Sequence, residues 1–179
     1  MRFTETTTLA ATPEDVFALM STPQFQQDKA DALGSLSCEA SVSHPDAGLT
    51  TVHTRREMPA GNVPEFIKAM VRPTLVVHER ELWREPGSDG ARSGEFRVDV
   101  VGAPIEVRGQ VSLVRVREGC TLTFDFELTT SVPLFKPAVE RAASTQVLAT
   151  ITTEFDLLRR RLQESERPHA PTASTPTKR

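Results

Sequence analysis

Tyrosine is absent from this chain of 179 residues, and aromatic residues make up only 6% of it. With so few aromatic rings, the chain lacks an obvious platform on which unpaired bases could stack. The net charge of −3, from 21 basic and 24 acidic residues, gives no electrostatic basis for binding a phosphate backbone. The sequence therefore predicts no nucleic-acid partner.

Cysteine and long apolar runs are also scarce. Cys38 and Cys120 are far apart, and neither belongs to a Cys-x-x-Cys pair or follows a histidine, so we expect free thiols. No apolar run approaches the ~20 residues that a membrane span needs. Arg2, Glu5 and a row of threonines stand where a signal peptide would need an apolar core. We expect a cytoplasmic protein without membrane insertion.

Familiar catalytic signatures are missing as well. The chain has no Gly-x-Ser-x-Gly motif, no phosphate-binding Gly-x-x-x-x-Gly-Lys and no dinucleotide fingerprint. No histidine, cysteine and aspartate grouping has the spacing of metal ligands. Asp125 and Glu127 share one strand face, but a solvated outer face explains them more simply than a proton-transfer site. We therefore expect no catalytic residue, no metal and no other cofactor.

The N-terminal part of the chain carries local signals for a strand and two short helices. The threonine-rich run from Arg2 to Leu9 favours an extended edge strand. Thr12-Pro-Glu-Asp15 is a Thr-x-x-Asp variant of the capping box, with proline at the first helical position. Thr22-Pro23 begins a second short helix, which we expect Gly34 to end.

Six further segments alternate apolar and polar residues and predict strands joined as antiparallel hairpins. They run through Leu36–Val42, Val52–Arg56, Thr74–Trp83, Phe96–Val100, Ile105–Val111 and Leu122–Leu128. Leu113-Val114 interrupts the alternation, which predicts a bulge or a change of phase. Between Pro59 and Arg72 the pattern favours a short helix, whose apolar face includes Phe66 and Met70 and forms a candidate lid.

A long amphipathic helix closes the pattern, from about Pro133 to about Glu164, with Glu140 on its polar side. Residues 166–179 are rich in proline, threonine and basic residues, and we expect a disordered tail. The predicted fold is α+β: one domain over residues 1–165, in which a curved seven-stranded antiparallel sheet surrounds the C-terminal helix.

Four stretches carry a resemblance to a known family. They are Thr54-Arg-Arg56, Glu81-Leu-Trp83, Gly102-Ala-Pro-Ile-Glu-Val-Arg-Gly109, and Val132-Pro-Leu134 leading into Glu140. With the order β-α-α-β6-α, residues 2–163 resemble the helix-grip fold of the START-like (SRPBCC, polyketide cyclase-like) superfamily, and most closely an actinobacterial START-like family of unknown function. The resemblance implies a deep apolar cavity between sheet and helix. Superfamily members bind lipids, sterols, polyketides or plant hormones there, and some catalyse cyclisation or dehydration.

Charged residues on the predicted strands are the polar site candidates. By alternation Glu81 shares a face with Trp83, and the resemblance also places Arg56 and Arg108 on strands. An unpaired buried charge is costly, so an arginine–carboxylate pair could line the cavity and hold a polar ligand head by bidentate hydrogen bonds. The alternative is a structural salt bridge or simple exposure. His78 has the opposite parity to Trp83 and is expected to be an ordinary surface histidine.

Apolar candidates for the cavity wall complete the hypothesis. They are Phe66, Met70, Trp83, Phe96, Val98, Phe124, Phe126, Val147 and Ile151. The leading hypothesis is non-catalytic binding of a hydrophobic or amphipathic small molecule, lipid or polyketide-like. Two alternatives stay open: a cyclase- or dehydratase-like enzyme acting on a polyketide-type substrate through Glu81, Arg56 or Arg108, and a module that binds a protein partner. The sequence does not indicate an oligomeric state.

Overall fold

The computed structural model describes residues 1–60, 72–103, 105–131 and 136–166. Seven antiparallel strands form one sheet in the order β1-β7-β6-β5-β4-β3-β2. Their bounds are β1 Arg2–Leu9, β2 Ser37–Ser43, β3 Leu49–Pro59, β4 Thr74–Arg84, β5 Arg92–Val101, β6 Ile105–Val116 and β7 Gly119–Thr130. Consecutive strands from β2 to β7 are neighbours, and β1 pairs with β7. The predicted seven-stranded antiparallel sheet is confirmed.

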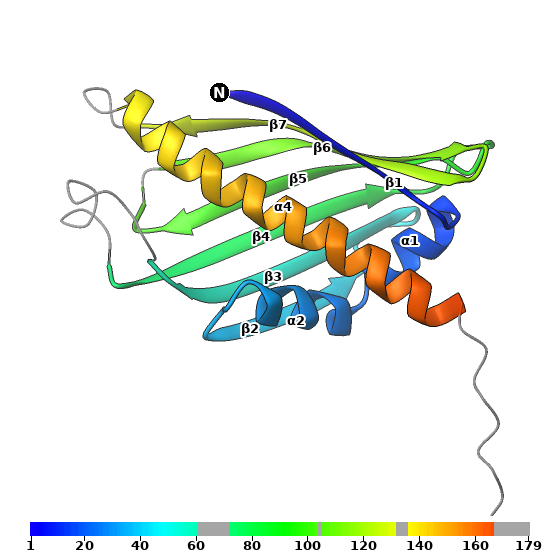
Figure 1. Ribbon diagram of the computed structural model, residues 1–179, viewed down its shortest axis with the longest axis horizontal. Helices are drawn as coiled ribbons and strands as arrows, with labels where there is room; N and C mark the ends of the chain where they lie inside the picture. Colours follow the sequence, from blue (N-terminus) through cyan, green and yellow to red (C-terminus); the bar gives the residue numbers. More distant parts are fainter. Residues whose placement is uncertain (61–71, 104, 132–135, 167–179) are drawn as a thin grey trace, which may run out of the picture.

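Three helices are described: α1 Pro13–Met20, α2 Pro23–Ala32 and α4 Lys136–Glu166. In Figure 1, α4 crosses the concave face of the sheet diagonally, α1 lies at one end of the sheet, and α2 lies beside β2. The fold is thus a curved sheet that holds one long helix, as expected. No helix among the described residues has the length and apolar character needed to cross a bilayer. The tail was predicted from residue 166, but Glu166 is the last residue of α4. Phe66, Met70 and residues 167–179 lie outside the described residues.

The short helices begin as the local sequence predicts. The Thr12 hydroxyl accepts a hydrogen bond from the Asp15 backbone N–H at 3.2 Å, and the Asp15 carboxylate accepts one from the Thr12 N–H at 3.3 Å. This reciprocal pair is the predicted capping box, with Pro13 at the first helical position. Gly34 follows α2 with φ of +69°, a left-handed conformation that glycine adopts without steric cost.

One prediction about β6 was wrong. The interrupted alternation at Leu113-Val114 suggested a bulge or a change of phase, but β6 pairs with β7 in continuous register, Leu113 opposite Leu122 and Val114 opposite Thr121. Leu113 is fully buried on the concave face, and Val114 is an exposed apolar residue on the convex face. An apolar side chain in a solvent-facing position disturbs the sequence pattern without disturbing the strand.

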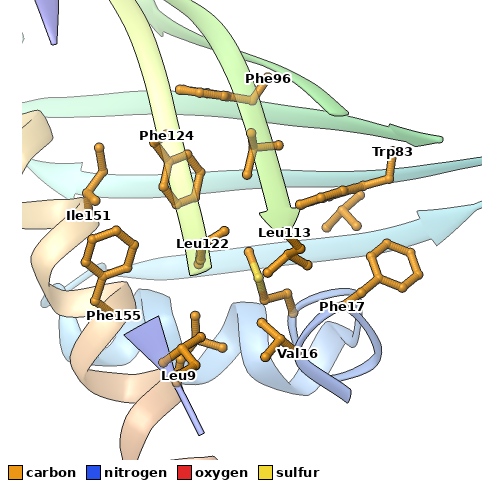
Figure 2. Packing of buried hydrophobic residues seen from close by; sticks show 14 of the residues in the cluster. Leu9, Val16, Phe17, Trp83, Phe96, Leu113, Leu122, Phe124, Ile151 and Phe155 are labelled. Atoms are coloured by element: carbon orange, nitrogen blue, oxygen red, sulfur yellow. The ribbon is translucent and has the colours of Figure 1, made fainter. Parts of the chain in front are cut away.

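The closed end of the interior lies around α1. Figure 2 shows Phe17 of α1 beside Trp83 of β4, and Phe155 of α4 beside Phe124 of β7. The Phe17 and Trp83 rings meet edge to face with centroids 5.5 Å apart, a favourable aromatic geometry. Trp83, Leu113 and Leu122 have no exposed surface here. The apolar face of α1 therefore completes a packed core at this end.

A buried charge cluster between the sheet and the helices

Four charged side chains from four elements meet inside the apolar interior. Lys29 of α2 donates from Nζ to Oε1 of Glu79 on β4 at 3.0 Å and to Oε2 of Glu154 on α4 at 3.2 Å. Arg56 of β3 donates from Nη2 to the other Glu79 oxygen, Oε2, at 2.7 Å. The Lys29 side chain is fully buried, and those of Arg56 and Glu154 are 3% exposed. The Glu79 side chain is 11% exposed, so the cluster is a largely buried ionic network.

Strand register explains why the β3 and β4 members face the same way. Glu81 lies opposite Val52 and Arg56 lies opposite Val77, so side chains of this parity on both strands share the concave face. Glu79, two residues from Glu81, points to the same side. Alternation in the sequence shows only which residues of one strand share a face. The pairing of β3 with β4 shows that Arg56 lies on the same face of the sheet as Glu79 and Glu81.

Glu81 is a fifth titratable member and contacts the single tryptophan. The Trp83 indole Nε1–H donates to Glu81 Oε2 at 2.7 Å, and both side chains are buried. Burial and the negative charges of Glu154 and Glu79 raise the pKa of Glu81 to about 8, although Lys29 opposes this. At neutral pH Glu81 is therefore largely a neutral carboxylic acid.

The pKa shifts of the other members indicate which of them stay charged at neutral pH. Burial opposes ionisation of Glu79, but Lys29 and Arg56 prevail and lower its pKa to about 2. Burial likewise opposes the charge on Lys29, yet attraction to Glu154 and Glu79 raises its pKa above the ordinary value. Burial raises the pKa of Glu154. Lys29 and Glu79 thus stay charged at neutral pH, and a permanently protonated Lys29 is a poor nucleophile.

The network leaves polar atoms without partners among the described residues. Arg56 uses only Nη2, and its Nε and Nη1 are buried with no hydrogen-bond acceptor. Glu154 Oε1 and the Thr54 hydroxyl are also buried and unpartnered. Buried polar groups are normally satisfied by protein or ordered water, so these atoms are the unsatisfied hydrogen-bonding groups of the network.

The concave face away from α1 is less tightly covered, and we call this region the open end. It consists of Met58, Leu75, Val98, Val100 and Ile105, all half-buried. Val98 and Val100 belong to β5, which has β4 and β6 on its two sides. Since neighbouring strands cover both edges of β5, the exposed surface of these side chains faces the interior side of the sheet. Val147 on α4 is half-buried too.

The predicted site residues separate into three groups in the structure. Arg56, Glu81, Trp83, Phe96, Phe124, Phe126 and Ile151 are buried between the sheet and helices, and Val98 and Val147 are half-buried there. Arg108 lies on the convex face with its side chain 62% exposed and donates to Glu106 at 2.6 Å, so its expected place in the wall was wrong. Phe66 and Met70 lie outside the described residues.

Sequence reasoning missed Lys29, Glu79 and Glu154. Lys29 follows buried Phe25 by four positions, and Glu154 stands three after Ile151 and four before Leu158, so both interrupt an apolar helix stripe. A charge on such a stripe is the signal that could have found them. Glu140 was expected on the polar side of the long helix but is buried.

Other surface features lie apart from this cluster. A hollow of about 300 Å³ between α2 and the end of α4 is lined mainly by charged side chains, among them Asp28 and Arg161. Asp125 and Glu127 are exposed on the convex face of β7, as expected. Within the described ranges, no group of three or more histidine, cysteine, aspartate or glutamate side chains is placed to hold a metal ion.

Comparison with known proteins adds a family and a fold. Residues 4–162 match one family description. The chain belongs to the family described as "Protein of unknown function (DUF2505)". The match covers most of the chain, including every member of the charge cluster. Its description assigns no activity to the DUF2505 family, and no curated protein matches this chain.

Solved structures resemble this member of the DUF2505 family in fold. A protein from Thermus thermophilus is 12% identical, with a TM-score of 0.64, 93% of this chain and 100% of the other covered. A STAR-related lipid transfer protein from Xanthomonas axonopodis is 15% identical, with a TM-score of 0.59 and coverage of 90% and 85%. A START superfamily protein from Mycobacterium smegmatis is 12% identical, with a TM-score of 0.55 and coverage of 90% and 98%. These likenesses show the START-like helix-grip fold.

Proposed function

We propose that this protein binds a hydrophobic or amphipathic small molecule, lipid or polyketide-like, between the sheet and α4 without changing it chemically. The observation that carries the proposal is the half-buried state of Val98, Val100 and Ile105 on the concave face. In a filled core, side chains of central strands would be covered like Leu122 at the closed end. A bound apolar chain would remove this surface from water, at about 25 cal/mol for each Å².

The fold supports this proposal by analogy. One structure of similar fold is described as a lipid transfer protein, and it shares 15% identity with this chain. Fold alone does not determine function, so the argument depends on the open end itself. The charge cluster beside that surface would meet the polar part of an amphipathic molecule, and the apolar wall would meet the rest.

Native mass spectrometry of the protein purified from its own host tests the proposal. We expect a stoichiometric adduct, which denaturing extraction should release as a hydrophobic molecule. Val98→Asn should reduce the retained adduct because it places an amide on the interior wall. Val114→Asn, on the exposed convex face of β6, is the matched control and should retain the adduct. Protein without adduct that also fails to bind added lipid or polyketide extracts would contradict the proposal.

A second candidate is the cyclase- or dehydratase-like enzyme, and Glu81 favours it. A buried carboxyl with a pKa of about 8 is protonated at neutral pH and is thus suited to donate a proton. Fold similarity extends to norcoclaurine synthase from Thalictrum flavum, with 14% identity and a TM-score of 0.54. The same extraction separates the two functions. A carrier would yield one compound from wild type and Glu81→Gln, whereas a dehydratase variant would accumulate a compound heavier by one water.

A further inference from the structure

We propose that the bound molecule carries a carboxylate, which lies against Arg56 while its apolar part lies along the open end. This inference rests on the function proposed above and specifies the chemical class of the ligand. It depends on three observations: the position of Arg56 along the sheet, its unpartnered donors, and the charges around it.

Register places Arg56 within the open end, level with Val100 and one level before Glu79, which lies opposite Val98. Arg56 lies opposite Val77, and Val77 lies opposite Val100, so these residues share one level across three strands. Glu79 and Glu81 follow at successively deeper levels, and Trp83 lies deepest, against α1. A molecule lying on the open end with its polar group directed inward would therefore meet Arg56 as the first charged side chain of β3 or β4.

Arg56 has hydrogen-bonding capacity that the protein leaves unused. Its bond to Glu79 engages one of three guanidinium nitrogens, and Nε and Nη1 have no partner among the described residues although the side chain is 3% exposed. A guanidinium is a rigid, positively charged set of donors with no acceptor, so an oxyanion matches both its geometry and its charge. Hydrogen bonds between two charged groups are stronger than neutral ones, and strongest where water is excluded.

The charges that surround Arg56 also suit an anion. Lys29 on α2 and Arg56 on β3 are permanent cations, whereas Glu79 is the one carboxylate shared by both. Glu81 is largely neutral at pH 7, so it adds little negative charge beside them. An arriving carboxylate would therefore give Arg56 a counter-charge that it does not share with Lys29. A cationic head group would instead place a third positive charge beside Arg56.

Calorimetry with matched probes tests the inference. Dodecanoic acid, dodecanol and dodecylamine have the same chain and differ in the charge of the head group. Each is titrated at pH 7, below its micelle concentration, into the full chain after native mass spectrometry shows it free of ligand. We expect the acid to bind at least about tenfold more tightly than the alcohol or the amine, as charge-assisted hydrogen bonds to a buried arginine would require.

A variant separates the role of Arg56 from that of the apolar wall. In Arg56→Gln the affinity ratio of acid to alcohol should fall to about one, with the alcohol bound as in wild type. Arg97→Gln is the control, because Arg97 is exposed on β5 and pairs with Asp99. Should Arg56→Gln fail to fold, nuclear magnetic resonance of dodecanoic acid labelled at its carboxyl carbon replaces it. The bound carboxyl should stay ionised at pH values that protonate the free acid.

The outcomes distinguish the two proposals. Equal binding of acid and alcohol overturns the carboxylate inference and leaves hydrophobic binding intact. Tightest binding of the amine also overturns it, since it would indicate a head group held by Glu154. If none of the three probes binds, both proposals fail for chains of this kind. An unchanged acid-to-alcohol ratio in Arg56→Gln would show that the carboxylate lies elsewhere.

Discussion

Glu79 is the residue on which the charge cluster depends, because its two oxygens hold Lys29 and Arg56 separately at 3.0 and 2.7 Å. Glu79→Gln would leave Arg56 without a charged partner and Lys29 with Glu154 alone. Removing one partner from a buried ion pair strands a charge in an apolar interior, which typically destabilises by about 3–5 kcal/mol. We expect a loss of that size in urea unfolding at pH 7, followed by Trp83 fluorescence.

The matched control is Glu127→Gln, which removes the same charge from the exposed convex face of β7. This control should change the unfolding free energy by less than about 0.5 kcal/mol. Equal losses in the two variants would mean that the buried network contributes nothing particular to stability.

Individual site residues were predictable only in part from sequence. Arg56 and Glu81 were recognisable because a charge on an apolar strand face must find a partner. The partner itself was not recognisable, since Glu79, Lys29 and Glu154 come from segments whose contacts only the tertiary fold determines. Arg108 illustrates the opposite error. It alternates with Val107 and Gly109, so the parity rule applied to Glu81 already assigns it to the other face.

At the scale of elements, Gly109 determines how three central strands pack. It lies opposite Phe96 on β5 and Phe126 on β7, whose ring centroids are 6.1 Å apart. A Cβ added at Gly109 would sit 2.3 Å from the Asp125 carbonyl oxygen and 2.6 Å from the Phe126 Cβ. Neither backbone nor Cβ can withdraw cheaply, so Gly109→Ala should destabilise by about 3 kcal/mol or more.

Thermal or urea unfolding of Gly109→Ala measures this effect against Gln110→Ala, whose side chain is exposed on the next position of β6. The control should unfold nearly as wild type does. Wild-type stability in Gly109→Ala would mean that β6 and β7 can separate locally at little cost, contrary to the close backbone approach in the structure.

Elements were easier to predict than their contacts, and for a physical reason. The capping box of α1 and the glycine after α2 depend on hydrogen bonds and backbone angles within a few residues, and both were confirmed. The strands followed from alternation, which reports burial of one face. The same reasoning failed at Leu113-Val114 because alternation cannot distinguish a bulge from an exposed valine.

At the scale of the whole molecule, the buried carboxyls connect folding to pH in opposite directions. Glu79 has a folded pKa of about 2 against an ordinary value of 4.5, so the unfolded chain binds its proton more readily. Stability from Glu79 is therefore complete above about pH 4.5 and is lost as pH falls towards 2. Its ion pairs thus favour the folded state at neutral pH and make it sensitive to acid.

Glu81 has the reverse effect, and it gives the last prediction. Its folded pKa of about 8 lies above the ordinary 4.5, so between these values the folded protein keeps a proton that the unfolded chain releases. Unfolding free energy should consequently decrease from about pH 4.5 to pH 8, by on the order of a few kcal/mol. Glu81→Gln keeps an acceptor for the Trp83 indole but cannot ionise. Urea unfolding at pH values from 4 to 9 should give an unfolding free energy that falls less steeply with pH above pH 4.5 in Glu81→Gln than in wild type. In Glu127→Gln the pH dependence should match that of wild type. If the unfolding free energy of Glu81→Gln fell with pH as steeply as that of wild type, the alkaline loss of stability would belong to Glu154, whose pKa burial also raises.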